Sequence, residues 1–111
     1  MRIAPVSDTE TAEPIEDVHL TVLGDGENVT MQHFRIESGA LIEEHSHPNE
    51  QVGFLFEGEL VFFGDGEERV VEAGDGFFIP GDEPHGVENR TDSPAIGAEL
   101  FSPPRDSFPW E

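Results

Sequence analysis

From Val18 onward, residues that favour tight turns divide the chain into short apolar or alternating runs. Turn segments such as GDGEN, GDGEE and PGDEP concentrate glycine, aspartate, asparagine and proline, the residues that hairpins and tight turns require. No window places apolar residues at helical spacing over a sustained length. Many short strands joined by tight turns predict an all-β sandwich or barrel.

The length of 111 residues suits one domain with one hydrophobic core. We expect this domain over residues 18–101. Residues 1–17 are polar and contain two prolines, and we expect them to form an N-terminal arm. Residues 102–111 contain three prolines, which predicts an extended C-terminal tail in which Trp110 covers an apolar patch.

The formal net charge is −20, from 25 acidic and five basic residues, all five of which are arginine. The acids are scattered over nearly every expected loop, which favours a surface adapted to a salt-rich cytoplasm over a surface for a cationic partner. We expect no nucleic-acid partner, because phosphate binding needs clustered basic residues. The chain has no cysteine, no membrane-spanning apolar run and no signal-peptide pattern. We therefore expect a cytoplasmic protein without disulfides, thiolate ligands or a membrane partner.

The run QVGFLFEGELVFF, residues 51–63, is apolar on both faces of its expected strands. Val52, Phe54 and Phe56 point one way, and Leu55 points the other way. A small barrel with one solvated face does not need this pattern, whereas two packed sheets or a sheet covered by a second subunit do. We therefore expect a homodimer.

Two histidines, His45 and His47, lie two residues apart in the segment EEHSHPNEQ. Residues at this spacing on an extended strand point to the same face, so both imidazoles can reach one metal ion. Taken alone, such a pair more often consists of surface residues that bind no metal ion. His85, on a different turn-bounded segment, supplies a third imidazole, and three neutral imidazoles suit a divalent cation such as Zn, Ni, Fe, Mn or Cu. The remaining histidines, His19 and His33, lie among apolar residues and are expected to be structural.

The spacing around these histidines resembles the two motifs of the cupin family. The segment GALIEEHSHPNEQVGFLFEG resembles the first motif, with Gly39, Gly58, a His-x-His pair and a fourth ligand position at Gln51. The segment GDGFFIPGDEPHGVEN resembles the second motif, which contains His85 and Asn89. The resemblance implies a double-stranded β-helix, or jelly-roll barrel, holding one divalent metal ion. Its ligands would be His45, His47, Gln51 and His85.

Two positions depart from the cupin pattern. The fourth ligand is usually glutamate, and the matching residue here is an amide. Glu50 beside it is the alternative ligand, which strand parity disfavours if the strand resumes after Pro48. In the second motif the glycine expected two residues after Pro80 is shifted by one, so that Gly81 precedes Asp82. This shift predicts an altered turn that leaves His85 in place.

The amide at the fourth position leaves every expected ligand neutral, so a bound ion keeps its full positive charge. Such a site is a stronger Lewis acid, attracts an anionic or enolate-bearing substrate, and suits high-valent iron less well. The alternative is that Gln51 weakens the site and leaves a metal-free binding barrel.

The segment AELFSPPRDSF, together with the first motif, resembles the KdgF-type cupins of pectin and alginate breakdown. The resemblance implies ring opening and tautomerisation of an unsaturated monouronate to its linear keto form, a 5-keto-4-deoxyuronate. It makes Glu99, where that group has aspartate, and Arg105 the candidate catalytic residues, and Arg105 and Phe101 the candidate substrate-binding residues. The alternatives are a cupin dioxygenase and a non-catalytic small-molecule-binding cupin.

Overall fold

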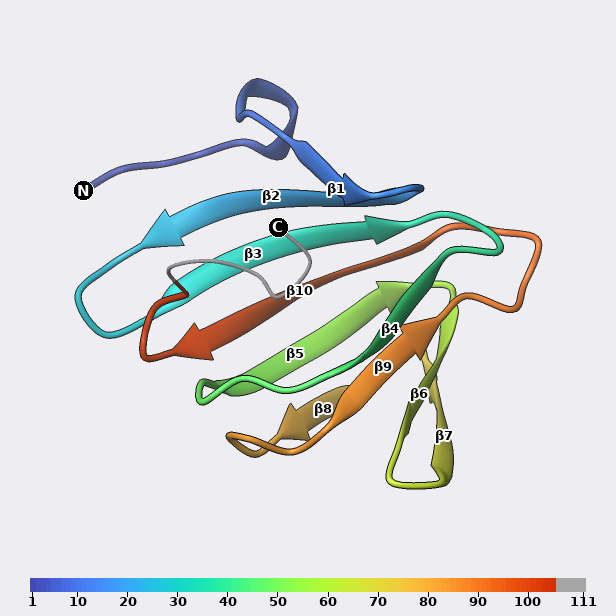
Figure 1. Cartoon of the computed structure of the whole chain (residues 1–111). Coiled ribbons are helices and arrows are strands. Elements are labelled where there is room, and N and C mark those ends of the chain that lie inside the picture. Colours follow the sequence, from blue (N-terminus) through green and yellow to red (C-terminus); the bar gives the residue numbers. More distant parts are fainter. Residues whose placement is uncertain (106–111) are drawn as a thin grey trace.

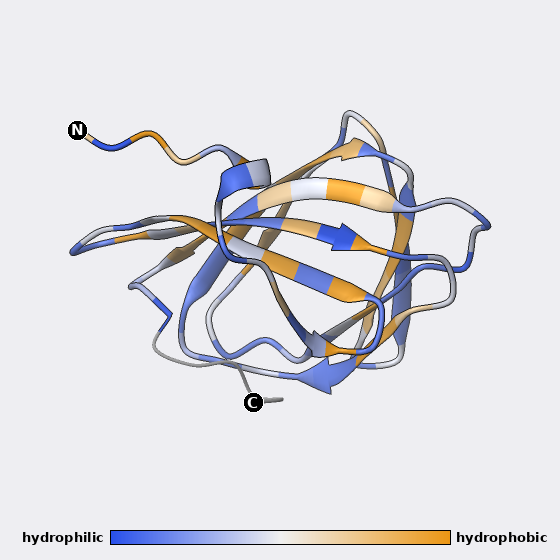
Figure 2. Ribbon diagram, turned by 90° about the horizontal axis from the view of Figure 1, so that it is seen from above, coloured by the Kyte–Doolittle hydropathy of each residue, from blue (hydrophilic) through white to orange (hydrophobic). Residues whose placement is uncertain are grey.

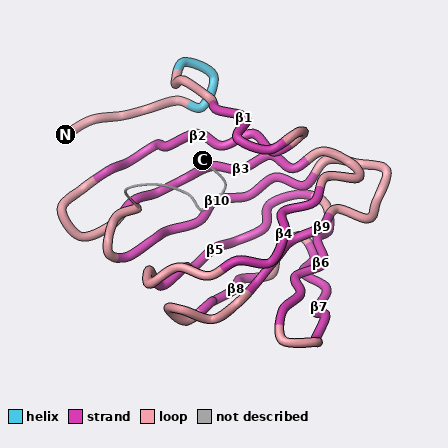
Figure 3. Tube along the Cα trace, viewed as in Figure 1, coloured by secondary structure: helices cyan, strands magenta, loops and turns pink. Residues whose placement is uncertain are grey.

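The computed structural model describes residues 1–105 of the chain (Figures 1 and 3). In this part of the chain one 3-10 turn, η1 (Val6–Asp8), precedes ten strands. The strands are β1 (Ala12–Ile15), β2 (Val18–Asp25), β3 (Thr30–Ile36), β4 (Leu41–His45), β5 (Glu50–Glu57), β6 (Glu59–Gly64), β7 (Glu67–Glu72), β8 (Gly76–Ile79), β9 (His85–Glu88) and β10 (Ala95–Ser102). No helix among the described residues has the length and apolar character needed to cross a membrane.

The strands form two sheets that face each other across one core (Figure 1). The larger sheet has the order β1-β2-β3-β10-β5-β8, and the smaller sheet has the order β4-β9-β6-β7. All these pairings are antiparallel, and β10 lies between β3 and β5 although it comes last in the chain. The all-β double-stranded β-helix predicted from the sequence is confirmed.

Alternation along the strands places one face of each sheet inside the barrel (Figure 2). On β5, Leu55 is fully buried while Val52, Phe54 and Phe56 are exposed, so the two groups point to opposite faces, as the sequence predicted. Each large apolar side chain buried in this way contributes about 1.5–3 kcal/mol. The core includes Val18, Leu20, Phe34, Ile36, Ile42, Leu55, Leu60, Val71 and Val87.

Residues in left-handed backbone explain the glycines of both motifs. At Gly58, which turns β5 into β6, φ is +85° and a Cβ would lie 2.5 Å from the Pro94 carbonyl oxygen. In the second motif Asp82 has a φ of 67°, so it adopts the conformation that usually requires glycine. The position at which the motif has glycine is therefore left-handed here, although the glycine itself is shifted by one residue.

The N-terminal segment differs from the expected arm. Residues 12–15 form β1, which pairs with β2 and extends the larger sheet. The hydroxyl groups of Thr11 and Thr21 lie 2.7 Å apart and fasten the segment to β2. This pairing satisfies backbone groups on an edge of β2 that would otherwise be open. At the other end β10 continues to Ser102, one residue beyond the expected limit, and Trp110 lies outside the described residues.

Candidate metal centre

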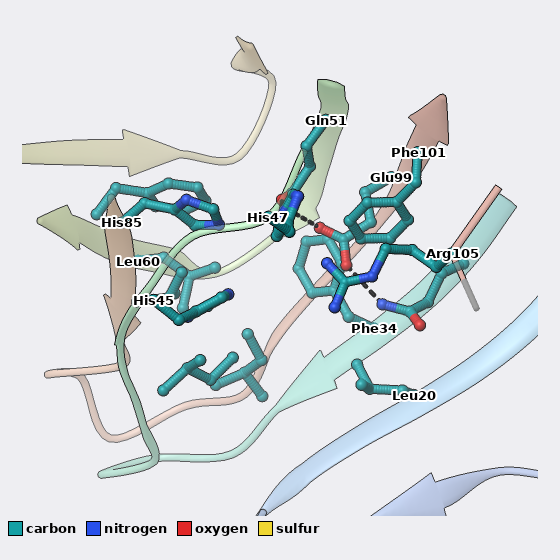
Figure 4. A pocket seen from close by; sticks show the side chains of 15 residues that line it. Leu20, Phe34, His45, His47, Gln51, Leu60, His85, Glu99, Phe101 and Arg105 are labelled. Carbon is teal, nitrogen blue, oxygen red and sulfur yellow. Dashed lines mark hydrogen bonds between the residues drawn. The ribbon is translucent and has the colours of Figure 1, made fainter. Parts of the chain in front are cut away.

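Three histidine side chains converge in a cavity between the two sheets (Figure 4). His45 ends β4, His47 lies in the connection to β5, and His85 begins β9. The antiparallel pairing of β4 with β9 sets His45 opposite His85, and their ring centroids are 4.5 Å apart. One ring nitrogen of each histidine lies within 4.8 Å of the other two. His45 and His47 therefore converge from a strand and the loop after it, and not from one continuous strand as expected.

A backbone carbonyl fixes the tautomer of each imidazole. The Nδ1 atom lies 2.8 Å from the Glu43 oxygen in His45, 3.1 Å from the Asn49 oxygen in His47 and 2.9 Å from the Glu83 oxygen in His85. A carbonyl oxygen only accepts hydrogen bonds, so Nδ1 carries the hydrogen in each neutral ring and Nε2 presents a lone pair. Contacts of this kind orient the histidine ligands of metal sites.

The local environment keeps these three rings neutral. Burial lowers the pKa of His47 to about 4 and lowers the pKa of His45 and His85, and the Arg105 guanidinium adds to each effect. His85 Nε2 is also buried without a hydrogen-bond partner. A buried lone pair without a partner is costly, and a metal ion would satisfy it. The three imidazoles therefore fit a divalent metal ion.

The side-chain amide of Gln51 lies in the same cavity as the three histidines. Its Oε1 lies 3.1 Å from His47 Nε2, and its Nε2 donates to Glu99 Oε1 at 2.7 Å. Because His47 carries its hydrogen on Nδ1, neither of the two facing atoms has a hydrogen to share, and two acceptors confront each other. A cation beside both atoms would turn this repulsion into attraction. Glu50, the alternative ligand, is exposed and does not line the cavity.

Glu99 is buried beside Gln51 on the central strand β10. It lies opposite Gln32 of β3, and the Gln32 Nε2 donates to Glu99 Oε2 at 2.7 Å. Both carboxyl oxygens of Glu99 therefore receive an amide hydrogen. Burial raises the pKa of Glu99 to about 7, against the opposing effects of Gln32, Gln51 and Arg105. The carboxyl group can therefore hold or release a proton near neutral pH.

Arg105 and Phe101 complete the cavity wall. Phe101 takes the next inward position after Glu99 on β10, and the Arg105 guanidinium carbon lies 5.2 Å from its ring centroid. The Arg105 backbone N–H donates to Thr30 Oγ1 at 3.2 Å. The Asn49 side-chain amide donates to the carbonyl oxygens of the two prolines before Arg105. The guanidinium faces Glu99 in Figure 4.

The cavity gathers every site residue expected from the sequence. Its lining includes His45, His47, Gln51, His85, Glu99, Phe101 and Arg105. Its volume of about 40 Å³ leaves room for a metal ion and a few waters. His19 and His33 lie outside it, and His19 Nε2 is 3.4 Å from a carboxylate oxygen of Glu37.

Two residues that shape the cavity were missed in the sequence, Gln32 and Asn49. Gln32 is almost fully buried and holds Glu99, while Asn49 positions the segment before Arg105. A signal for Gln32 was present, because it occupies the inward phase of β3 together with Phe34 and Ile36. A polar residue in an otherwise apolar phase needs a buried partner.

The fold and the cavity define a small β-barrel domain with a three-histidine cluster suited to a metal ion. The chain belongs to the cupin family, since the family model described as Cupin domain matches residues 32–100. An RmlC-like cupin from Shewanella frigidimarina superposes with a TM-score of 0.85 at 27% identity, over 96% of this chain and 94% of that chain. KdgF from Halomonas sp. superposes with a TM-score of 0.86 at 20% identity, over 96% of both chains.

A curated relative is the tetracenomycin polyketide synthase protein TcmJ from Streptomyces glaucescens. It is 34% identical to this chain over 72 residues, which are 64% of this chain and 48% of TcmJ. The chain thus spans about half the length of this relative. These comparisons confirm the cupin resemblance, and the likeness to KdgF is one of fold.

Proposed function

We propose that this cupin is a metal-dependent enzyme that converts an unsaturated monouronate to its linear keto form, a 5-keto-4-deoxyuronate. The observation that carries the proposal is the placement of Glu99 and Arg105 in one small cavity with three neutral imidazoles. A proton-transfer group, a cation for a carboxylate and a metal site together suit the isomerisation of a sugar acid. We expect the metal to be Zn, Ni, Fe or Mn.

The charge of the cavity favours an anionic substrate. Three imidazoles and the Gln51 amide are neutral, so they leave the charge of a divalent ion uncompensated. Arg105 adds a positive charge, and among the residues that the structure describes Glu99 is the single carboxyl group in the cavity lining. The rest of the chain carries a large negative charge that repels anions over long distances. Salt screens that repulsion and leaves the short-range attraction in the cavity, so a salt-rich medium would favour substrate entry.

Each residue has a defined role in the proposed reaction. A bound ion would stabilise negative charge that develops on a substrate oxygen. Arg105 holds the uronate carboxylate in a planar fork, and Phe101 supports the guanidinium. Glu99 accepts a proton from the hydroxyl group at which the ring opens and returns a proton to the carbon that becomes saturated. The reaction is an isomerisation, so these two transfers balance and no co-reactant is needed.

The cavity is smaller than a monouronate, so we place only the reacting end of the substrate inside it. Gln32 and Gln51 hold the Glu99 carboxyl group while the substrate spans the cavity mouth.

Incubation of the metal-loaded protein with an unsaturated monouronate tests this function. We expect loss of the ultraviolet absorbance of the conjugated double bond, abolished by a chelator and restored by added metal. Unchanged absorbance with metal bound would overturn the proposal. Oxygen consumption with flavonols or thiols would instead indicate a dioxygenase. No activity in either assay would indicate a binding protein.

Replacing Arg105 by alanine should raise the KM for the uronate by about 10–100-fold, because a charge-assisted hydrogen-bonding group of about 1.5–3 kcal/mol is lost. The change in kcat should be smaller, since Arg105 contacts the carboxylate of the substrate, which does not react. Steady-state kinetics measure both constants. Arg69→Ala is the matched control, because Arg69 is exposed on β7 next to Glu67. An unchanged KM in Arg105→Ala would rule out binding of the uronate carboxylate by Arg105.

A second candidate function is a role in polyketide synthesis, as the name of TcmJ suggests for that relative. The identity to TcmJ is higher than the identity to KdgF. A second cavity of about 490 Å³ shares His85 and Phe62 with the first and is also lined by Phe63, Phe77 and Phe78. Such a lining suits a planar aromatic ligand. Binding of a polyaromatic compound without uronate turnover would favour this candidate.

A further inference from the structure

The buried carboxyl group of Glu99 lies between two glutamine side chains. Glu99 belongs to the central strand β10, Gln32 lies opposite it on β3, and Gln51 lies diagonally across from it on β5. The exposed fractions of Gln32, Gln51 and Glu99 are 1%, 7% and 9%. Bulk water therefore does not compete for these polar groups, and the hydrogen bonds among them determine how each side chain is oriented.

Both amides turn their NH₂ groups toward the carboxyl group (Figure 4). Gln32 donates to Glu99 Oε2 and Gln51 donates to Glu99 Oε1, each over 2.7 Å. The two amide oxygens are turned away from the carboxyl group as a result. The oxygen of Gln32 is buried without a hydrogen-bond partner, and the oxygen of Gln51 faces the Nε2 lone pair of His47 at 3.1 Å. The contact with Glu99 therefore outweighs the needs of both amide oxygens.

Reversal of the Gln51 amide would close the candidate metal centre. A reversed amide donates an N–H to His47 Nε2, which in a metal-free protein is a better contact than two facing acceptors. It also occupies the lone pair with which His47 would bind a metal ion, and it removes the oxygen ligand. The carboxylate of Glu99 opposes this reversal, because the Gln51 oxygen would then face a negatively charged oxygen and a charge-assisted hydrogen bond would be lost.

We propose that Glu99 is a positioning residue for the metal ligand Gln51: its carboxylate, anchored by Gln32, keeps the Gln51 oxygen turned toward the metal site. Histidine ligands are commonly oriented by hydrogen bonds to carboxylates or carbonyl groups, and here a carboxylate acts in the same way on an amide ligand. This role is separate from proton transfer. It does not depend on which substrate the cavity binds.

An amide at position 99 would release the constraint on Gln51. In Glu99→Gln, Gln32 can still donate to the oxygen of the new amide, whose NH₂ group then donates to the oxygen of Gln51. Gln51 in turn donates to His47 Nε2, so each contact between neighbours becomes a hydrogen bond. Reversal of Gln32 instead would leave the Gln51 oxygen against His47 Nε2 and form one hydrogen bond fewer among these four side chains. We therefore expect Gln51 to be the side chain that reverses.

Nuclear magnetic resonance of the ¹⁵N-labelled, chelator-treated protein tests the orientation of the amide. In mildly alkaline buffer, in which Glu99 is ionised, the wild type should show no coupling across a hydrogen bond between Gln51 Nε2 and His47 Nε2. Glu99→Gln should show this coupling. Glu50→Gln is the matched control and should resemble the wild type, because Glu50 is exposed and does not line the cavity. Coupling in the wild type, or its absence in Glu99→Gln, would refute the positioning role.

The affinity for Zn²⁺, measured by competition with a chromophoric chelator, tests the consequence for the metal site. Glu99→Gln should raise the dissociation constant by about 10–100-fold, the usual effect of losing a group that orients a ligand. Gln51→Met removes the amide that is oriented, so Glu99→Gln should have little further effect in that background. An equal loss in both backgrounds would mean that Glu99 acts on the ion only through its charge, and would overturn the proposal. Circular dichroism establishes that each variant keeps its strands, and the wild-type spectrum tests the proposal independently of any variant.

Discussion

The His85→Ala variant should purify without a stoichiometric metal ion, and a chelator should leave its melting temperature unchanged. One of three converging imidazoles is lost in this variant, together with the buried Nε2 lone pair that has no other partner. Loss of a residue that only supports a ligand weakens metal binding by about 10–100-fold, so we expect loss of a ligand to exceed about 100-fold. Metal analysis after gel filtration and thermal melts with and without chelator measure the effect.

The wild-type chain provides the contrast for this prediction. Metal present at about 100 times its dissociation constant stabilises a protein by about 2.7 kcal/mol, and a chelator should remove that stabilisation. His19→Ala should behave as the wild type, because His19 lies outside the cavity beside Glu37. His85→Gln fills more of the space and separates loss of the imidazole from loss of packing. Full metal content in both His85 variants would contradict the assignment of the site.

Replacing Glu99 by glutamine should lower the turnover of the proposed substrate by about 10²–10⁴-fold, the usual contribution of a proton-transfer group. The carboxylate offers one oxygen to Gln32 and the other to Gln51, whereas the introduced amide offers only one oxygen. One of the two glutamines must then reorient. If Gln51 reorients, its NH₂ group replaces its oxygen beside His47, and metal affinity should fall as well.

The same variant should change how the stability of the metal-free protein depends on pH. Burial raises the pKa of Glu99 to about 7 from an ordinary value of 4.5, so the folded state binds this proton more tightly than the unfolded state. The stabilisation is complete below pH 4.5 and is lost as the pH rises through about 7. The loss amounts to about 3 kcal/mol and should be absent in Glu99→Gln.

Denaturant unfolding at several pH values, compared between the two proteins, measures the difference. The other acidic residues are common to both proteins and cancel in the comparison. Glu50→Gln is the matched control, because Glu50 is an exposed carboxyl group outside the cavity. It should leave activity, metal content and the pH dependence as in the wild type. Identical pH profiles for wild type and Glu99→Gln would show that the Glu99 proton is not linked to folding.

The residues of the candidate site could be predicted because their spacing resembles the cupin motifs. A His-x-His pair, a third histidine on a later turn-bounded segment and two residues of one phase on a late strand are all visible in the sequence. Glycines in left-handed backbone, such as Gly58, fix the turns between them. The preference for Gln51 over Glu50 also followed from strand parity, and the structure places Gln51 inside and Glu50 outside.

The remaining features depend on pairings between distant parts of the chain. Gln32 and Glu99 meet because β3 and β10 are neighbours in a register that no local pattern specifies. The attachment of Asn49 to the chain before Arg105 spans more than 50 residues. Strand β1 was missed because it is short, contains Pro14 and lies in a polar segment, so that its order comes from pairing with β2. Long-range pairing and not local propensity determined these features.

The carbonyl contacts of the three histidines separate the chemistry of the cavity from the charge of the surface. Imidazole ligands are often oriented by a carboxylate. The basicity of a ring oriented in this way would depend on the pH and the salt concentration of the medium. Here Glu43, Asn49 and Glu83 contribute only their main-chain oxygens. The acidic side chains of Glu43 and Glu83 are therefore replaceable without changing a tautomer. A lineage of such proteins could gain or lose surface acids while it moves between habitats of different salinity, and its inner cluster would keep the same properties.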